Sequence, residues 1–251
     1  MKIAIFADIH GNSLALDATL ADVEEVGVDG YWVLGDLVAL GPDPIGVLER
    51  LSKLRNCSII RGNTDRYVVT GDRPPPYPAD IYQDHEAIRI FAEVAGTFAW
   101  TQGAVTIAGW FDWLAKLPLD YEMILPDGTK CLCAHATPGN DDGYGIDKDL
   151  PDSEVRELLK GCTADLICVG HNHQPINRKV DRWHILNPGS ISNPRHPILQ
   201  ASYAVLDASN KGYRIEHRLV EYDRDEVISQ VQELKHPGAD FIIRHMRGLK
   251  K

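Results

Sequence analysis

The sequence predicts an α/β protein built around a parallel β-sheet. Short apolar runs, which are typical of buried strands, alternate with segments whose apolar residues recur at helical spacing. Within residues 2–60 the order is strand, helix, strand, helix, strand. That order favours parallel strands joined by right-handed crossovers.

The elements of this first part follow from the apolar spacing and from the residues that bound each run. Asn12 or Ser13 suits the N-cap of the first helix, and Gly27 ends it. Gly41-Pro42-Asp43-Pro44 is typical of a turn. We expect strands at 2–7, 31–34 and 58–60, and helices at 13–26 and 45–54.

Residues 66–117 interrupt the alternation. The proline-rich run 73–78 fits neither a helix nor an inner strand, whereas helices are expected at 84–98 and 109–117. We interpret this segment as a helical insertion, covering one side of the site, within a single domain that spans 1–251. Its aromatic side chains are expected to pack between helices and not to form a substrate platform: Tyr82, Phe91, Trp100, Trp110, Phe111 and Trp113.

The second half of the chain combines hairpins, buried strands and two helices. We expect hairpins at 121–134 and 202–220, strands at 165–169 and 183–186, and helices at 152–159 and 225–234. The loop acids Asp141 and Asp142 are expected to be solvated, because no strand precedes them. Residues 235–251 are expected to form a loosely held tail.

The composition is that of an ordinary globular enzyme, with 251 residues, 44% hydrophobic and 25% charged. The net charge of -10 argues against broad nucleic-acid binding. Neither a membrane span nor a leader is evident, so we expect a cytoplasmic protein with no membrane partner. The five cysteines are expected to be reduced, buried thiols and not disulfides or zinc ligands.

Side chains that bind metals follow five of the expected strands. A parallel sheet brings its strand ends to one edge, so these side chains can converge although they are far apart in the sequence. Seven nitrogen and oxygen ligands exceed what one tetrahedral zinc needs, and two ions that share a carboxylate fit better. Asp36 is the natural bridge. The seven are Asp8, His10, Asp36, Asn63, His135, His171 and His173.

The order of these motifs resembles the calcineurin-like metallophosphoesterases, in particular their small prokaryotic branch. The matching blocks cover roughly residues 1–207: Asp8-Ile9-His10, Gly35-Asp36, Gly62-Asn63-Thr64-Asp65, His135 and Gly170-His171-Asn172-His173. The resemblance implies a four-layer α/β/β/α sandwich of two mixed sheets.

The resemblance also implies how the ligands divide between two divalent metal ions. One ion would be held by Asp8, His10, Asp36 and His173, and the other by Asp36, Asn63, His135 and His171. A bridging hydroxide would be the nucleophile, and Asn63 would also donate a hydrogen bond to the phosphate. A site without thiols suits Mn, Fe, Zn, Ni or Co, with Mn favoured.

The chain departs from the family at Thr64, where the family often has a histidine that protonates the leaving group. A threonine hydroxyl is a poor proton donor at neutral pH. Asp65 would ordinarily orient that histidine, and we expect it to contact a ligand histidine instead. Other candidate acids are His85, His184 and His196, and candidate substrate contacts are Asn12, Arg61 and Arg195.

Three functions remain open from the sequence. The leading one is a binuclear metal-dependent phosphoesterase, with phosphodiesterase as the favoured activity, that acts on a small phosphorylated substrate. The second is a metal-loaded phosphate-binding or sensor protein with little turnover, which Thr64 favours and the complete ligand set opposes. The third is a mononuclear metal site whose other ligands are incidental. Whether the chain forms a homo-oligomer is left open.

Overall fold

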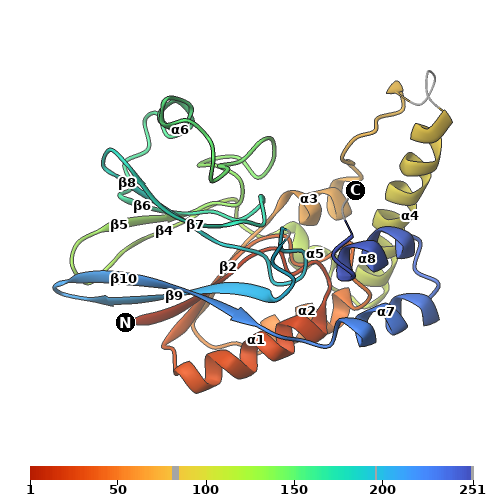
Figure 1. Cartoon of the computed structure of the whole chain (residues 1–251), viewed down its shortest axis with the longest axis horizontal. Coiled ribbons are helices and arrows are strands. Elements are labelled where there is room, and N and C mark those ends of the chain that lie inside the picture. The colour runs from red at the N-terminus through yellow and green to blue at the C-terminus, as the bar shows by residue number, and fades with distance from the viewer. Residues whose placement is uncertain (81–84, 196, 250–251) are drawn as a thin grey trace.

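Two five-stranded mixed sheets form the middle of this computed structural model (Figure 1). The structure describes residues 1–80, 85–195 and 197–249, without the side chains of residues 85 and 86. The first sheet has the order β10-β9-β1-β2-β3, with β1 (Lys2–Phe6), β2 (Gly30–Leu34), β3 (Cys57–Ile60), β9 (Ala201–Ser209) and β10 (Gly212–Val220). Strands β1, β2 and β3 are parallel, as predicted, and β9 and β10 are antiparallel additions.

The second sheet also has a parallel centre, but it has an antiparallel strand at each edge. Its order is β4-β5-β6-β8-β7, with β4 (Tyr121–Ile124), β5 (Lys130–Cys133), β6 (Leu166–Cys168), β7 (Pro175–Val180) and β8 (Trp183–Pro188). Strands β5, β6 and β8 run parallel. The hairpin of β4 and β5 was predicted, whereas β7 was not.

The two sheets pack face to face and carry helices on their outer faces, so the four-layer sandwich is confirmed (Figure 1). Helices α1 (Ser13–Val26) and α2 (Pro44–Leu51) cover the first sheet, where Leu16 and Leu48 pack near Phe6. Helix α6 (Asp152–Leu158) covers the second sheet through Val155. Asn12 caps α1 as expected, because its Oδ1 accepts a hydrogen bond from the backbone N–H of Ala15.

The remaining helices gather at one end of the sandwich (Figure 1). They are α3 (Asn63–Thr70), α4 (His85–Ile107), α5 (Phe111–Ala115), α7 (Arg224–Glu233) and α8 (Ala239–Met246). Trp110, Phe111 and Trp113 pack against the core, as predicted for the aromatic residues of this segment. Tyr82 lies outside the described residues. Within the described ranges, no helix is both long enough and apolar enough to cross a membrane.

The expectation of a loose tail after Lys235 was wrong. Residues Ala239–Met246 form α8, whose buried Ile242 and Met246 pack against Val227 and Val231 of α7. Ile242 and Met246 are four residues apart and therefore lie on one face of the helix, which the packing buries. The chain end is thereby held against the helical end of the molecule.

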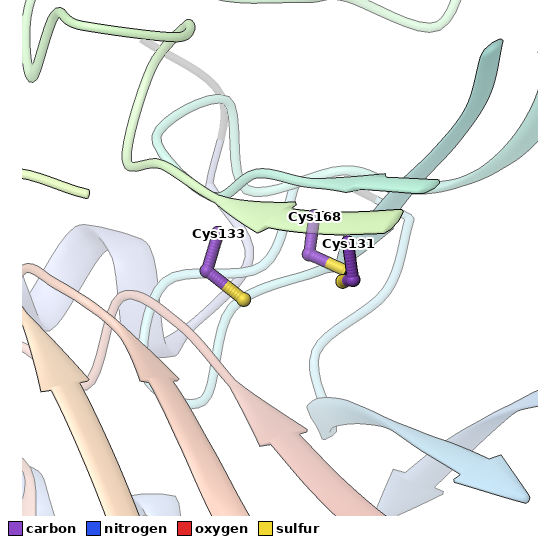
Figure 2. Close-up of side chains that lie close together, drawn as sticks. All are labelled: Cys131, Cys133 and Cys168. Carbon is purple, nitrogen blue, oxygen red and sulfur yellow. The ribbon is translucent and has the colours of Figure 1, made fainter. Parts of the chain in front are cut away.

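The layer between the sheets contains three of the five cysteines. Figure 2 shows Cys131 and Cys133 on β5 and Cys168 on β6, with their sulfur atoms facing the other sheet. All three are buried, and the Sγ atoms of Cys131 and Cys168 are 3.9 Å apart. None of the cysteines forms a disulfide in the described structure, as the sequence predicted.

Candidate metal centre

The seven predicted ligands come together where strands of both sheets end. Asp8 and His10 follow β1, Asp36 follows β2, and Asn63 begins α3 after β3. From the other sheet, His135 follows β5, and His171 and His173 follow β6. From the residue pattern alone, we expected the seven ligands to converge at the edge of one parallel sheet. Instead, the face-to-face packing of two sheets brings the two groups together.

Four of the ligands form a first cluster. Ligand atoms of Asp8, His10, Asp36 and His173 all lie within 4.8 Å of one another. The Nε2 atoms of His10 and His173 are 3.2 Å apart, and Nε2 of His173 is 3.6 Å from Oδ1 of Asp8. An oxygen and nitrogen donor set of this kind suits a divalent metal ion.

The second cluster is centred on the amide oxygen of Asn63. Nε2 of His135 lies 3.1 Å from this Oδ1, and Nδ1 of His171 lies 3.0 Å from it. Asp36 belongs to both clusters, because its Oδ2 is 3.7 Å from Nε2 of His10 while its Oδ1 is 3.4 Å from Nε2 of His135. Each carboxylate oxygen thus faces a different cluster.

Three of the histidines are oriented by backbone carbonyl oxygens. Nδ1 of His135 donates to Leu34 at 2.6 Å, Nδ1 of His173 donates to Asn193 at 2.8 Å, and Nε2 of His171 donates to Gly143 at 2.8 Å. A carbonyl oxygen only accepts hydrogen bonds, so these nitrogens carry the proton. The other nitrogen of each ring is then free to bind a metal ion.

The backbone of the centre adopts an uncommon conformation. Left-handed φ angles are rare for residues other than glycine and cluster at functional sites. Gly62 lies so close to Asp36 that a Cβ atom at this position would overlap the Asp36 backbone nitrogen. Five of the seven ligands have φ between 48° and 67°: Asp8, His10, Asp36, His171 and His173.

Burial decides the charge of most groups in the centre. It lowers the pKa of His10 to about 4, and it lowers the pKa of His173 well below its ordinary value. Burial also acts to raise the pKa of Asp36, but the attraction and hydrogen bond of His135 outweigh it and hold that pKa low. His10 and His173 are therefore neutral, which is the form that binds metal ions. Burial acts to lower the pKa of His135 as well, but the attraction of Asp36 outweighs it and raises that pKa to about 10, so a metal ion that binds His135 must displace a proton.

Two buried polar atoms of the first cluster have no hydrogen-bond partner. They are Oδ2 of Asp8 and Nδ1 of His10, and both residues are at most 1% exposed. An unpaired buried carboxylate oxygen costs free energy unless a ligand satisfies it. Together with the donor types and tautomers, the unpaired Asp8 oxygen shows that these residues fit divalent metal ions.

Asp65 does not contact a ligand histidine, so that expectation was wrong. Its Oδ1 accepts hydrogen bonds from the backbone N–H groups of Leu37 and Val38, and its Oδ2 accepts one from Gly62. Burial raises the pKa of Asp65 to about 7. The carboxyl group therefore ties the loop after β2, which carries Asp36, to the start of α3.

Thr64 lines the hollow beside the centre, and its hydroxyl donates to the backbone carbonyl of Val38 at 3.3 Å. The candidate acid His184 lies in β8 and hydrogen-bonds Tyr213 and Asn177, away from the seven ligands. His196 and the side chain of His85 lie outside the described residues.

The three candidate substrate contacts all have partners within the chain. The amide nitrogen of Asn12 donates to Ser192, and its oxygen caps α1. Arg61 pairs with Asp141, and Arg195 pairs with Asp147. None of the three lines the larger hollow at the ligands, but Arg195 lines a smaller one that also includes His173; substrate contact by them stays a prediction.

Asp141 and Asp142 are not simply solvated loop acids, and that interpretation was wrong. Asp141 is 4% exposed and accepts hydrogen bonds from Arg61 and Arg66. Asp142 accepts from Arg66 and from the hydroxyl of Tyr67. These pairs attach the loop after β5 to α3 and to Arg61 just before it. Asp141 and Arg61 are about 80 residues apart in the sequence, so local sequence patterns do not predict their contact.

Comparison with known proteins identifies relatives over nearly the whole chain. The calcineurin-like phosphoesterase superfamily domain matches residues 1–211. An uncharacterized protein of Methanocaldococcus jannaschii is 30% identical over 250 residues, which cover 94% of this chain and 93% of the relative.

Two crystal structures share the fold. A hypothetical protein from Pyrococcus horikoshii has a TM-score of 0.81 at 22% identity, covering 98% of this chain and 97% of its own. A metallophosphoesterase from Sphaerobacter thermophilus has a TM-score of 0.77 at 23% identity, covering 99% and 98% respectively. In both, the likeness extends through the helical end to the last part of the chain.

Proposed function

The chain belongs to the calcineurin-like phosphoesterase superfamily, and we propose that it is a phosphodiesterase that uses two divalent metal ions. The observation that carries this proposal is the position of Asp36. Its two oxygens face two different groups of nitrogen and oxygen donors, at 3.7 Å and 3.4 Å. A shared carboxylate is typical of centres that hold a pair of ions about 3.5–4 Å apart.

In this proposal Asp8, His10, Asp36 and His173 hold one ion, and Asp36, Asn63, His135 and His171 hold the other. Bound divalent ions supply positive charge for the phosphoryl oxygens and lower the pKa of coordinated water. Their donor set suits Mn, Fe, Zn, Ni or Co, and we favour Mn.

Residues around the ions would position the ester and not protonate it. Asn63 turns its amide oxygen towards His135 and His171, which leaves its amide nitrogen as a donor for a phosphoryl oxygen. Thr64 directs its hydroxyl at Val38 and has no proton of suitable acidity to give. We therefore expect the enzyme to prefer esters whose leaving group needs little protonation.

A metal-loaded phosphate-binding or sensor protein is the second candidate function. The same observation on Thr64 favours it, because a centre without a proton donor turns over slowly on poor leaving groups. The seven assembled ligands oppose it, because phosphate binding alone requires fewer of them.

Hydrolysis of bis(4-nitrophenyl) phosphate and of 4-nitrophenyl phosphate, with and without added Mn²⁺, tests the proposal. We expect metal-dependent turnover of the diester that exceeds turnover of the monoester, and we expect it to disappear in Asp36→Ala. If protein that holds two ions per chain hydrolyses neither compound with any divalent metal, the sensor function replaces the hydrolase.

A further inference from the structure

A large hollow opens directly onto the candidate metal centre. Its volume is about 600 Å³, within the range of small-molecule sites. Five of the seven ligands form its inner end: His10, Asp36, Asn63, His171 and His173. Its outer walls come from the two helical segments α4 and α8, which lie beside each other at the end of the sandwich (Figure 1).

The walls of this hollow are mainly apolar. The apolar side chains include Leu40, Ile90, Val94, Phe98, Phe241 and Ile242, with Arg89, Glu93 and Arg244 as charged neighbours. Ile90 is 41% exposed although it is a large aliphatic residue. Apolar walls that continue into a polar centre are typical of sites that bind an apolar group and react with a polar one.

Contacts between α4 and the region of α8 fix the shape of the hollow. The backbone N–H of Phe241 donates to Oε1 of Glu93 at 3.3 Å. The rings of Trp100 and His236 meet edge to face with centroids 4.6 Å apart. A Cβ atom added to Gly96 would lie 3.1 Å from Cβ of Pro237, so the two segments approach closely. The hollow is therefore formed before any ligand binds.

A second, smaller hollow meets the first at the same place. It has a volume of about 280 Å³ and shares Leu40, His173, Phe241 and Arg244 with the larger one. Its remaining walls include Asn193 and Arg195. A phosphate at the centre would thus have two spaces of unequal size beside it, both with mainly apolar walls.

Building on the proposed function, we propose that the substrate is an unsymmetrical phosphodiester with one large apolar ester arm. The apolar arm occupies the larger hollow between α4 and α8, where it contacts Ile90, Val94 and Phe241. The smaller arm lies in the second hollow. The ester arm that fills the larger hollow determines specificity, because burial of its apolar surface adds binding free energy that the phosphate cannot supply.

Binding of two model diesters to the manganese-loaded protein tests this inference by calorimetry. Dimethyl phosphate carries no large arm, and methyl 2-phenylethyl phosphate carries one apolar arm. Both have poor alkyl leaving groups, so turnover during the titration is slow. We expect the phenylethyl diester to bind about ten-fold more tightly, since a buried phenyl ring removes on the order of 100 Å² from water.

Substitutions in the walls of the larger hollow test whether the apolar ester arm binds there. Ile90→Ala and Phe241→Ala are expected to reduce the ten-fold preference at least three-fold, and Ile90→Ala is expected to leave the affinity for dimethyl phosphate unchanged. Ile107→Ala is the matched control for Ile90→Ala, because Ile107 is also in α4 but is 91% exposed and lies outside the hollow. Thermal melting of each variant checks that α8 stays folded.

Equal affinity for the two diesters, or a preference that survives in both Ile90→Ala and Phe241→Ala, would overturn the inference. The proposed function fails separately, through absent hydrolysis of bis(4-nitrophenyl) phosphate. A protein that hydrolyses this compound but shows no arm preference therefore keeps the proposed function and loses only the substrate class.

Discussion

The cluster of Asp and His side chains at the strand ends and the thiol cluster between the sheets resemble each other in two respects. Both consist of residues that can bind metal ions, and in both the candidate ligand atoms lie within 4.8 Å of one another. Both are also largely withdrawn from solvent. Proximity and burial therefore do not distinguish a reaction centre from a packed core.

The two clusters differ in backbone and in access. Cys131, Cys133 and Cys168 lie in regular strands (Figure 2). They belong to the apolar cluster between the two sheets. Asp8 and His10 instead have left-handed φ angles and each carries an unpaired buried atom, and His10 lines a hollow of about 600 Å³. A centre for chemistry thus needs unsatisfied ligands, a constrained backbone and a path for substrate, and the thiol cluster lacks these among the described residues.

Replacing the shared carboxylate should have the largest effect. In Asp36→Ala both ions lose a ligand, so we expect metal-dependent turnover to fall at least about a thousand-fold. Metal content measured after dialysis should fall below one ion per chain. Asp181→Ala is the matched control, because Asp181 pairs with Arg156 on the surface and should change neither quantity. Unchanged metal content in Asp36→Ala would contradict the two-ion centre.

Removing the carboxyl group that supports the centre should have the next largest effect. Asp65→Ala leaves three buried N–H groups without an acceptor and should lower the free energy of unfolding by about 2–4 kcal/mol. Denaturant titration measures this change. Asp65→Asn keeps one acceptor oxygen and should lose less. If Asp65→Ala were as stable as the parent, the three hydrogen bonds would contribute nothing to holding the loop of Asp36.

Introducing a proton donor should narrow the rate difference between good and poor leaving groups. Thr64→His should accelerate hydrolysis of diesters with poor leaving groups about ten-fold, which is less than the roughly 100-fold or more that a well-positioned general acid contributes. Diesters with nitrophenolate leaving groups should gain little. A pH–rate profile should show a new limb near the pKa of an imidazole. Equal rates for Thr64→His and the parent on poor leaving groups would show that protonation is not limiting.

Removing thiols should have the smallest effect. We expect Cys131→Ala, Cys133→Ala and Cys168→Ala each to lower the free energy of unfolding by about 1 kcal/mol, because each leaves a small cavity between the sheets. Metal content and diester turnover should stay unchanged. Loss of one bound ion per chain in any of these variants would contradict this prediction, because it would show that the thiols also hold a metal ion.

The parts of the fold that depend on local patterns could be predicted from the sequence. Helix α1 has its predicted bounds, because Asn12 and Gly27 mark its ends chemically. Strand β7 and helices α3 and α8 were missed. Ile242 and Met246 are buried only because α7 packs against them. The packing of α7 against α8 is a tertiary contact, which local sequence patterns do not predict.

For the candidate metal centre too, the sequence predicts the residues that follow local patterns but not the contacts that depend on the fold. The seven ligands could be named because each follows an apolar strand, and the structure brings all seven together. The partners of Asp65 and Asp141 could not be predicted. Asp65 contacts backbone N–H groups, which every sequence contains, and Asp141 pairs with arginines about 80 residues away. Such contacts depend on the complete fold and not on residue type.

The left-handed backbone conformation of the metal centre determines which substitutions would relieve strain in this protein. Each such residue costs about 1 kcal/mol or more, which glycine at the same position would not. Selection for thermal robustness alone would therefore favour glycine at Asp8, His10, Asp36, His171 and His173. The residues kept there instead cost conformational stability, and their hydrogen bonds to Thr64, Gly143 and Asn193, together with any ion that binds them, offset this cost.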